Sequence, residues 1–128
     1  MYLCNSLTWD GKTRKMVGVI PAEVAMHPKP QGRGYVRLRE TDAHPWPLSD
    51  DRSEPVSAHE FHYSALAAMP DGLNFAYRVE RGYGLDGAND GIVYRNLLAS
   101  YAHLRDTRSH PWAERFVEFV RVCRDRAA

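Results

Sequence analysis

Proline placement limits what this chain can fold into more than any other feature of its sequence. Six of the eight prolines fall within residues 21–55. Each proline fixes φ, removes a backbone donor and disfavours helical backbone at the preceding residue, so we expect loops and short strands there. Residues 35–39 alternate apolar and charged side chains, which is typical of a half-buried strand, and Gly32 and Gly34 predict a turn before it. Residues 16–20 are an earlier candidate for a short strand.

Strand-like sequences continue beyond the prolines. Residues 59–63 and 75–80 carry aromatic side chains in alternating patterns, and residues 92–94 are β-branched or aromatic. The 82–91 segment between the last two is rich in turn-forming residues. Residues 97–103 form a short apolar run, which predicts a strand buried on both faces. We expect a run of antiparallel strands.

The end of the chain predicts an amphipathic helix. Ser109 or His110 can cap it, and Pro111 suits its first turn. Apolar side chains recur at helical spacing from Trp112 to Cys123, with acidic residues early and arginines late, as the helix dipole favours. We expect this apolar stripe to pack on the sheet as part of the core.

Composition indicates one domain that spans residues 1–128 and folds without a cofactor. The 17 basic and 16 acidic residues are spread evenly over both halves, which argues against nucleic acid and an anionic membrane as partners. The sequence has no apolar run of the ~18 residues that a membrane span needs and no signal-like start, so we expect a cytoplasmic protein. Cys4 and Cys123 are too few for a disulfide framework.

Residues 82–87 satisfy the dinucleotide-binding pattern G-x-G-x-x-G. That pattern binds phosphate only where a helix begins at the glycines and points its N-terminus at the ligand. Here Asn89, Asp90 and Gly91 follow as a turn that leads into a strand, so we expect no nucleotide site.

His59, Glu60 and His62 invite comparison with a zinc motif. Their spacing is one residue short of H-E-x-x-H, and on a strand the two histidines point to opposite faces, so we expect no metal site. The same alternation places Glu60 and His62 on one face. They could line a polar pocket together or form a surface pair on a half-buried strand.

His103 ends the apolar run at 97–103, and a side chain at the carboxyl end of a strand can enter a ligand-binding crevice. The sequence pattern leaves two interpretations open, a catalytic base or a core or edge histidine. Cys4 lies in a half-apolar segment without a glycine elbow, which favours a buried structural thiol over a nucleophile.

Three stretches carry a family resemblance: Ala-His-Glu-Phe-His-Tyr-Ser at 58–64, Gly-Tyr-Gly-Leu-Asp-Gly-Ala-Asn-Asp-Gly at 82–91, and Asn-Leu-Leu-Ala-Ser-Tyr-Ala-His-Leu at 96–104. They resemble the glutamine amidotransferase lobe of cobyrinic acid a,c-diamide synthases, in the cobyrinate and cobyrate synthase branch of the class I amidotransferases. Residues 16–21 and 31–35 are also similar to this lobe. The resemblance implies an α/β fold, part of a class I three-layer sandwich, β-rich with the amphipathic helix at its C-terminal end.

Members of this family are longer and include an ATP-binding domain. Their nucleophile sits in a Cys-Gly-Gly-Leu elbow that runs directly into Met-Tyr-Leu, and this chain begins with Met1-Tyr2-Leu3. The resemblance therefore implies that residues 1–128 are the C-terminal portion of a glutamine amidotransferase domain, and that the nucleophile and the ATP site lie outside this sequence. Cys4 would lie on the helix after the elbow, about two turns beyond the nucleophile. ATP and magnesium would belong to the larger enzyme, with no cofactor and no metal in this chain.

The same resemblance gives one residue a role. His103 matches the family's catalytic histidine, the base that deprotonates the cysteine and then protonates the leaving ammonia. Typical class I members carry a glutamate two residues later that orients this histidine, but Arg105 occupies that position and has no acceptor. Our hypothesis is that Glu60 or a backbone carbonyl orients His103 instead.

The resemblance implies part of an ATP-dependent ligase that hydrolyses glutamine and amidates tetrapyrrole acetate side chains in cobalamin biosynthesis, with this chain inactive alone. Corrinoids are the expected tetrapyrrole partners, and a sirohaem-type tetrapyrrole is a close alternative. A function of a different class is a non-catalytic binding module, and half of a split amidotransferase would reconcile the two. An incomplete lobe leaves a sheet edge or helix face uncovered, so we expect self-association or a partner chain.

Overall fold

Strands make up most of the fold. The computed structural model describes residues 1–47 and 54–127, which form an α/β, strand-rich unit with a C-terminal helix. The elements are β1 (Cys4–Trp9), β2 (Lys12–Lys15), β3 (Ile20–Met26), β4 (Gly32–Glu40), β5 (Val56–His62), β6 (Ser64–Ala68), β7 (Asn74–Arg81), β8 (Asn89–Tyr94), β9 (Leu97–Ala99), β10 (His103–Leu104) and α1 (Trp112–Ala127). No helix in these ranges is long and apolar enough to cross a bilayer.

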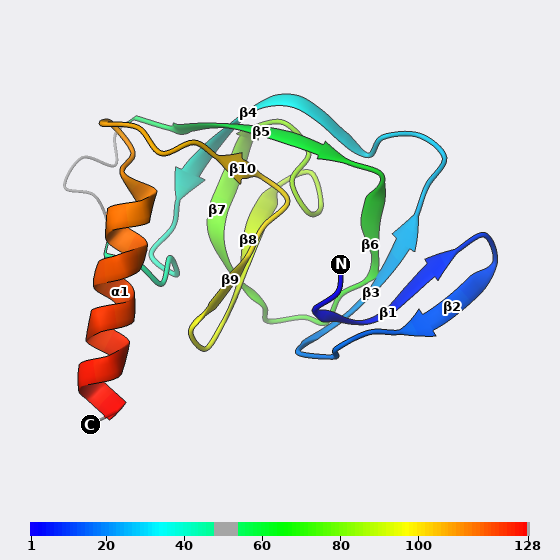
Figure 1. Ribbon diagram of the computed structural model, residues 1–128. Helices are drawn as coiled ribbons and strands as arrows, with labels where there is room; N and C mark the ends of the chain where they lie inside the picture. Colours follow the sequence, from blue (N-terminus) through cyan, green and yellow to red (C-terminus); the bar gives the residue numbers. More distant parts are fainter. Residues whose placement is uncertain (48–53, 128) are drawn as a thin grey trace.

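Two sheets share the strands, in the orders β2-β1-β3-β6 and β10-β5-β4-β7-β8-β9. The described pairs are antiparallel, as predicted, except for the parallel pair β1 and β3. Figure 1 shows the larger sheet strongly curled, with β4 and β5 crossing above β7 and β8. Its edge strands β9 and β10 are separated in sequence only by residues 100–102, so the two edges must lie within about 14 Å of each other.

Alternation along β5 shows why this sequence forms a sheet with one buried face. Side chains at Val56, Ala58, Glu60 and His62 are buried, while those between them are exposed. The apolar members join Val36, Leu38, Ala76 and Tyr77 in the core of the larger sheet. A period of two separates the faces in this way, and β4 alternates similarly around Val36 and Leu38. The strands predicted at 35–39, 59–63 and 75–80 are confirmed as parts of β4, β5 and β7.

The proline-rich stretch holds longer strands than predicted. Pro21 stands second in β3, and β4 extends over nine residues. Gly32 and Gly34 lie inside β4 instead of forming a turn before it. Gly32 pairs with His62, and a Cβ there would lie 2.3 Å from His62 Nε2, so this glycine permits close approach. The strand predicted at 16–20 is wrong, because residues 16–19 only connect β2 to β3.

Two further expectations are corrected, one in each sheet. The single buried strand predicted at 97–103 is split into β9 and β10 by a turn at residues 100–102. Cys4 opens strand β1, whereas the resemblance implied a helix at that point.

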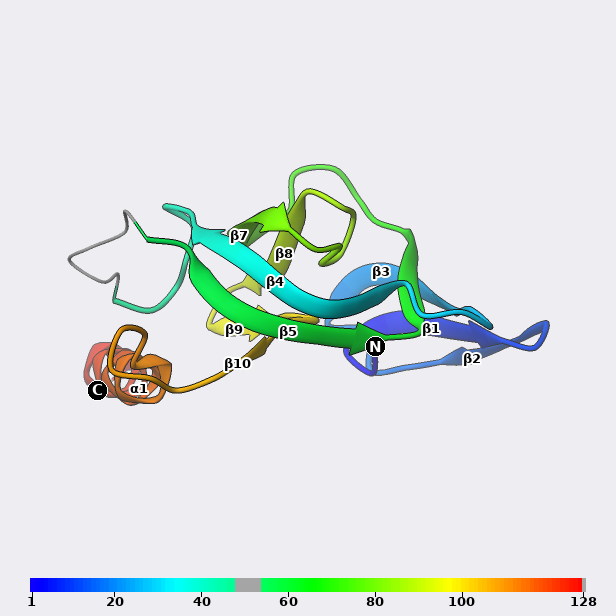
Figure 2. The same ribbon diagram turned by 90° about the horizontal axis from the view of Figure 1, so that it is seen from above.

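Helix α1 forms where the sequence predicts it but is not a core helix. Figures 1 and 2 place it at one end of the molecule, with the β1–β2 hairpin at the other end. Trp112 and Phe116, near its start, pack on Trp46 in the loop that follows β4. Two members of the predicted stripe, Phe116 and Val120, are nevertheless 43% and 48% exposed. The prediction that the whole apolar stripe packs on the sheet is therefore wrong.

Candidate functional site

His103 lies on the outer edge strand of the larger sheet. In β10 it pairs with His59 of β5, and the two imidazole centroids are 6.3 Å apart. Its side chain is exposed and faces a cavity of about 750 Å³. Tyr35, His59, Arg105, Ser109 and His110 also line this cavity. The position predicted to carry the base is thus the wall of a cavity large enough for a small polar substrate.

Glu60 lies on the opposite, buried face of β5. Its two carboxylate oxygens accept hydrogen bonds from the backbone N–H groups of Tyr83 and Gly84, each at 2.8 Å. These donors belong to the glycine-rich loop at residues 82–88, whose backbone curls around the carboxylate with φ of +115° at Gly82. The backbone N–H groups that could bind a phosphate are therefore occupied by the Glu60 carboxylate. A nucleotide site also needs a helix after the glycines, whereas strand β8 follows this loop.

His62 also points inward, on the same face as Glu60. Its Nδ1 donates to the carbonyl oxygen of Ser64 at 2.8 Å, and its ring stacks on Tyr101 with centroids 3.9 Å apart. Its buried Nε2 lies 3.6 Å from Glu60 Oε2, too long for a hydrogen bond. The two side chains are neighbours, as the alternation predicts, but they do not line the cavity that contains His103.

The structure does not bring Glu60 to His103. The carboxylate is committed to the glycine-rich loop, while His103 pairs with His59 on the other face of β5. Arg105, in the position where a glutamate would orient the histidine, lines the same cavity as His103.

Asp90 is the residue that sequence analysis missed. It lies in β8, its side chain is fully buried, and its carboxylate accepts hydrogen bonds from the turn at residues 100–102, which immediately precedes His103. The signal in the sequence was Asn89-Asp90-Gly91, which predicted only a turn. The burial of this carboxylate has no local signal in the sequence, because three of its hydrogen-bond donors lie ten to twelve residues later.

Neither cysteine of the chain lines the His103 cavity. Cys4 is buried in the other core cluster with Ile20 and Ile92, and burial raises the pKa of its thiol. Cys123 lies on α1. A buried thiol with a raised pKa forms little thiolate at neutral pH, which agrees with the prediction that Cys4 is structural.

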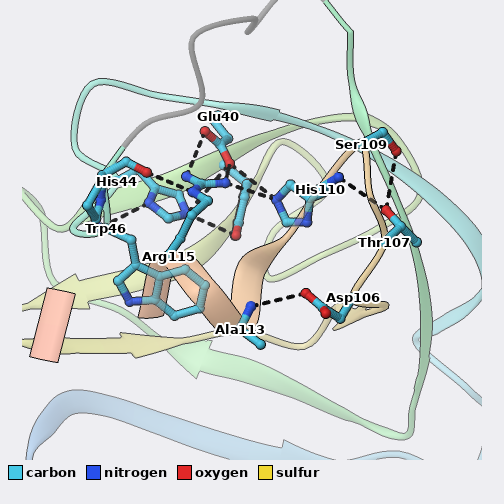
Figure 3. A network of polar contacts seen from close by, with 11 residues as sticks. Glu40, His44, Trp46, Asp106, Thr107, Ser109, His110, Ala113 and Arg115 are labelled. Atoms are coloured by element: carbon cyan, nitrogen blue, oxygen red, sulfur yellow. Dashed lines mark hydrogen bonds and ion pairs between the residues drawn. The ribbon is translucent and has the colours of Figure 1, made fainter. Parts of the chain in front are cut away.

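A second polar cluster fastens α1 to the sheet, and Figure 3 shows four of its members, Glu40, His44, His110 and Arg115. Together with Tyr77, which contacts His44, they form the Glu40 cluster. Arg115 donates from Nη1 and Nη2 to the two oxygens of Glu40, at 2.6 and 3.1 Å. His110 Nε2 is 3.3 Å from Glu40, and His44 Nε2 is 3.0 Å from Tyr77 Oη. This cluster joins the end of β4 to a helix more than seventy residues later.

The Glu40 cluster holds its charges in fixed states. Burial by itself raises the pKa of Glu40, but hydrogen bonds with His110 and Arg115 and the charge of Arg115 lower it to about 2. Burial lowers the pKa of His44 to about 4, with Glu40 opposing the shift. At neutral pH the cluster therefore contains a carboxylate paired with a guanidinium and a neutral His44. Within the described ranges, no group of three or more His, Cys, Asp or Glu side chains is placed to hold a metal ion.

Comparison with known proteins finds one family along most of the chain. Residues 1–109 match the CobB/CobQ-like glutamine amidotransferase domain. A protein of Magnetococcus marinus named cobyrinate a,c-diamide synthase is 45% identical over 121 residues, which cover 94% of this chain and 25% of that protein. Proteins of the same name from Halobacterium salinarum and Archaeoglobus fulgidus are 40% and 36% identical, over 94% and 92% of this chain and 25% of each relative.

These matches confirm the resemblance drawn from residues 58–64, 82–91 and 96–104. The chain spans about a quarter of the length of the curated relatives it matches.

Proposed function

Because the chain belongs to the family of CobB/CobQ-like glutamine amidotransferase domains, we propose that it supplies the catalytic base, His103, of a glutamine-hydrolysing site. The observation that carries the proposal is the place of this imidazole, exposed on an edge strand at the wall of a 750 Å³ cavity. A general base must be reachable by both the nucleophile and the substrate. Cys4, Glu60 and His62 are buried elsewhere and do not meet that requirement.

Glutamine hydrolysis requires two proton transfers by His103. Its imidazole takes the proton of a cysteine thiol, and the thiolate attacks the side-chain amide carbon of glutamine. The imidazolium then gives the proton to the departing nitrogen, so that ammonia leaves and a thioester remains for water to hydrolyse. Neither Cys4 nor Cys123 lines the cavity, so the proposal requires a cysteine from outside these 128 residues.

The larger reaction is proposed from the names of the relatives. We infer that the ammonia is used by a ligase of the cobyrinate a,c-diamide synthase type, which amidates carboxylates of a corrinoid. The resemblance assigns ATP and magnesium to the larger enzyme, and the described residues of this chain offer no fit for either. The glycine-rich loop is filled by Glu60, and no acidic cluster there is placed for a metal ion. The two sheets and α1 would be part of a class I three-layer sandwich that other segments complete.

Ammonia release from glutamine tests the role of His103. In a synthase that contains this chain, His103→Ala should lower glutamine hydrolysis by about 10²–10⁴-fold, the contribution of a general base, while amidation with added ammonia persists. His27→Ala is the matched control, because His27 is exposed and does not line the cavity. The 128-residue chain alone should release no ammonia. Turnover by that chain which His103→Ala abolishes would overturn the need for an outside cysteine.

The separation of both cysteines from the His103 cavity also favours a second candidate, a non-catalytic binding module or half of a split amidotransferase. In the split form, adding the cysteine-bearing partner to the purified chain restores ammonia release. In the binding module, His103→Ala leaves glutamine hydrolysis by the complete synthase unchanged.

A further inference from the structure

The turn at residues 100–102 joins β9 to β10 and immediately precedes His103. We propose that Asp90 is a positioning residue, whose buried carboxylate holds the main chain of this turn so that His103 enters the cavity in one fixed direction. The inference rests on the proposed role of His103 and adds the group that the family pattern leaves open, because Arg105 cannot accept a hydrogen bond from an imidazole.

The carboxylate of Asp90 is saturated by hydrogen bonds. Oδ1 accepts from the N–H groups of Gly91 and Tyr101, at 2.8 and 3.1 Å. Oδ2 accepts from the N–H group of Ala102 and the hydroxyl of Ser100, at 2.9 and 2.8 Å. A carboxylate offers about four acceptor positions, and here four donors use them. Three of the four donors belong to the turn, so its conformation is tied to one side chain.

The opposite side of the turn is held by side chains of β5 and β6. Tyr101 stacks on His62, and its hydroxyl lies 2.7 Å from Ser64 Oγ. His62 is itself fixed by its hydrogen bond to the carbonyl oxygen of Ser64. His62 therefore contacts Tyr101, which lies two residues before His103, and does not itself line the cavity.

The topology explains why this turn needs a strong hold. β9 pairs with β8, and β10 pairs with β5. β9 and β10 are therefore the two opposite edge strands of the larger sheet. The turn is the bridge between these edges, and the alternative for an apolar run of this kind is one continuous strand. Asp90 ends β9 at Ala99 by accepting hydrogen bonds from the next three residues, and the chain can then pair His103 with His59 in β10. A displacement of about 1 Å in a catalytic group can cost 10²-fold in rate.

Hydrogen exchange on the 128-residue chain tests the hold itself. Asp90→Asn replaces one acceptor oxygen by an NH₂ group that faces backbone donors, so the amides of Tyr101 and Ala102 should exchange at least about tenfold faster. Asp86→Asn is the matched control, because Asp86 accepts backbone N–H bonds from Ala88 and Asn89 in an exposed turn. Unchanged exchange at residues 101 and 102 in Asp90→Asn overturns the proposal.

Should Asp90→Asn fail to fold, Ser100→Ala removes a single donor and keeps the carboxylate. It should speed exchange at Ala102, whose N–H also lies 3.0 Å from Ser100 Oγ, by about threefold or more. No change at Ala102 in this variant contradicts the proposal equally.

Kinetics of the complete synthase separate positioning from stability. Asp90→Asn should lower kcat for glutamine hydrolysis by about 10²-fold, with KM within about twofold and ammonia-dependent amidation unchanged. Asp86→Asn should leave all three at the original values. If His103→Ala abolishes hydrolysis and Asp90→Asn does not lower kcat, the positioning role fails while the proposed function stands. If His103→Ala has no effect, the proposed function fails, and the exchange experiment still decides whether Asp90 holds the turn.

Discussion

Two buried carboxylates, Asp90 and Glu40, are satisfied in opposite ways. Asp90 accepts from backbone N–H groups and one hydroxyl, all within twelve residues of it in sequence. Glu40 pairs with the cationic side chain of Arg115, seventy-five residues away, and with His110. Neutral backbone donors fix the path of the main chain, whereas a distant guanidinium fastens one element to another. The first arrangement shapes a site and the second attaches a helix.

Removing Asp90 should have the largest effect on the stability of the chain. Asp90→Ala leaves three backbone N–H groups and a hydroxyl without their acceptor at the bridge between the two sheet edges. Each unsatisfied buried donor costs about 1–3 kcal/mol, and partial access to water reduces the sum. We expect the free energy of unfolding to fall by about 3–5 kcal/mol in urea titrations. Asp86→Ala, in an exposed turn, should cost no more than about 1 kcal/mol. Equal losses would show that the buried carboxylate is not special.

The same contrast explains which parts of the fold could be predicted from the sequence. Alternation is a local signal, and it located β4 and β5 because each has one buried face. It failed at residues 97–103, because the carboxylate that ends the strand lies ten to twelve residues earlier in the chain. The helix was predictable from its own residues. Its packing was not, because its partners Trp46 and Glu40 belong to a distant loop and strand end.

The candidate site shows a similar division. Alternation placed Glu60 and His62 on one face, but it could not say that this face is buried against the glycine-rich loop and Tyr101. The role of His103 came from the resemblance and stays a prediction. The sequence around Gly32 does not show why a glycine is needed there. The reason is that His62, its pairing partner on β5, leaves no room for a Cβ.

Acid should weaken the attachment of the helix through Glu40 and His44. Both bind protons less readily in the folded chain, where their pKa values are about 2 and about 4, than in the unfolded chain at 4.5 and 6.5. Stability is therefore complete above pH 6.5, falls between 6.5 and 4 as His44 resists protonation, and falls again between 4.5 and 2 through Glu40. The Glu40 step corresponds to about 3 kcal/mol.

Tryptophan fluorescence during acid titration measures this loss, because Trp46 and Trp112 stack at the base of the helix. In Glu40→Gln the step between pH 4.5 and 2 should be smaller, while the step between 6.5 and 4 remains. Stability that rises on acidification through either range would contradict the assignment of charges.

Breaking the Glu40 pair at neutral pH should have a smaller and more local effect. Glu40→Gln leaves Arg115 without its carboxylate, but the helix can swing away and return the guanidinium to water, so we expect a loss of about 2 kcal/mol. Trypsin should then cleave at the arginines of α1 before it cleaves the sheets, a pattern that mass spectrometry of early fragments detects. Glu118→Gln is the control on the same helix, because its pair with Arg121 is exposed and should contribute less than about 0.5 kcal/mol. Simultaneous cleavage of sheets and helix would show that α1 and the sheets unfold together.

The smallest effect on stability is expected on the exposed side of α1. Val117 and Val120 are about half exposed because the helix is fastened through Trp112, Arg115 and Phe116, near its start. The double change Val117→Ser and Val120→Ser should alter the free energy of unfolding by no more than about 0.5 kcal/mol. It should nevertheless reduce self-association, because an uncovered apolar helix face favours contact with a second surface. Sedimentation velocity over a concentration series measures this. If the unchanged chain stays monomeric throughout, the predicted self-association is wrong. If the double change costs more than about 1 kcal/mol, this side of α1 is packed more closely than its exposure indicates.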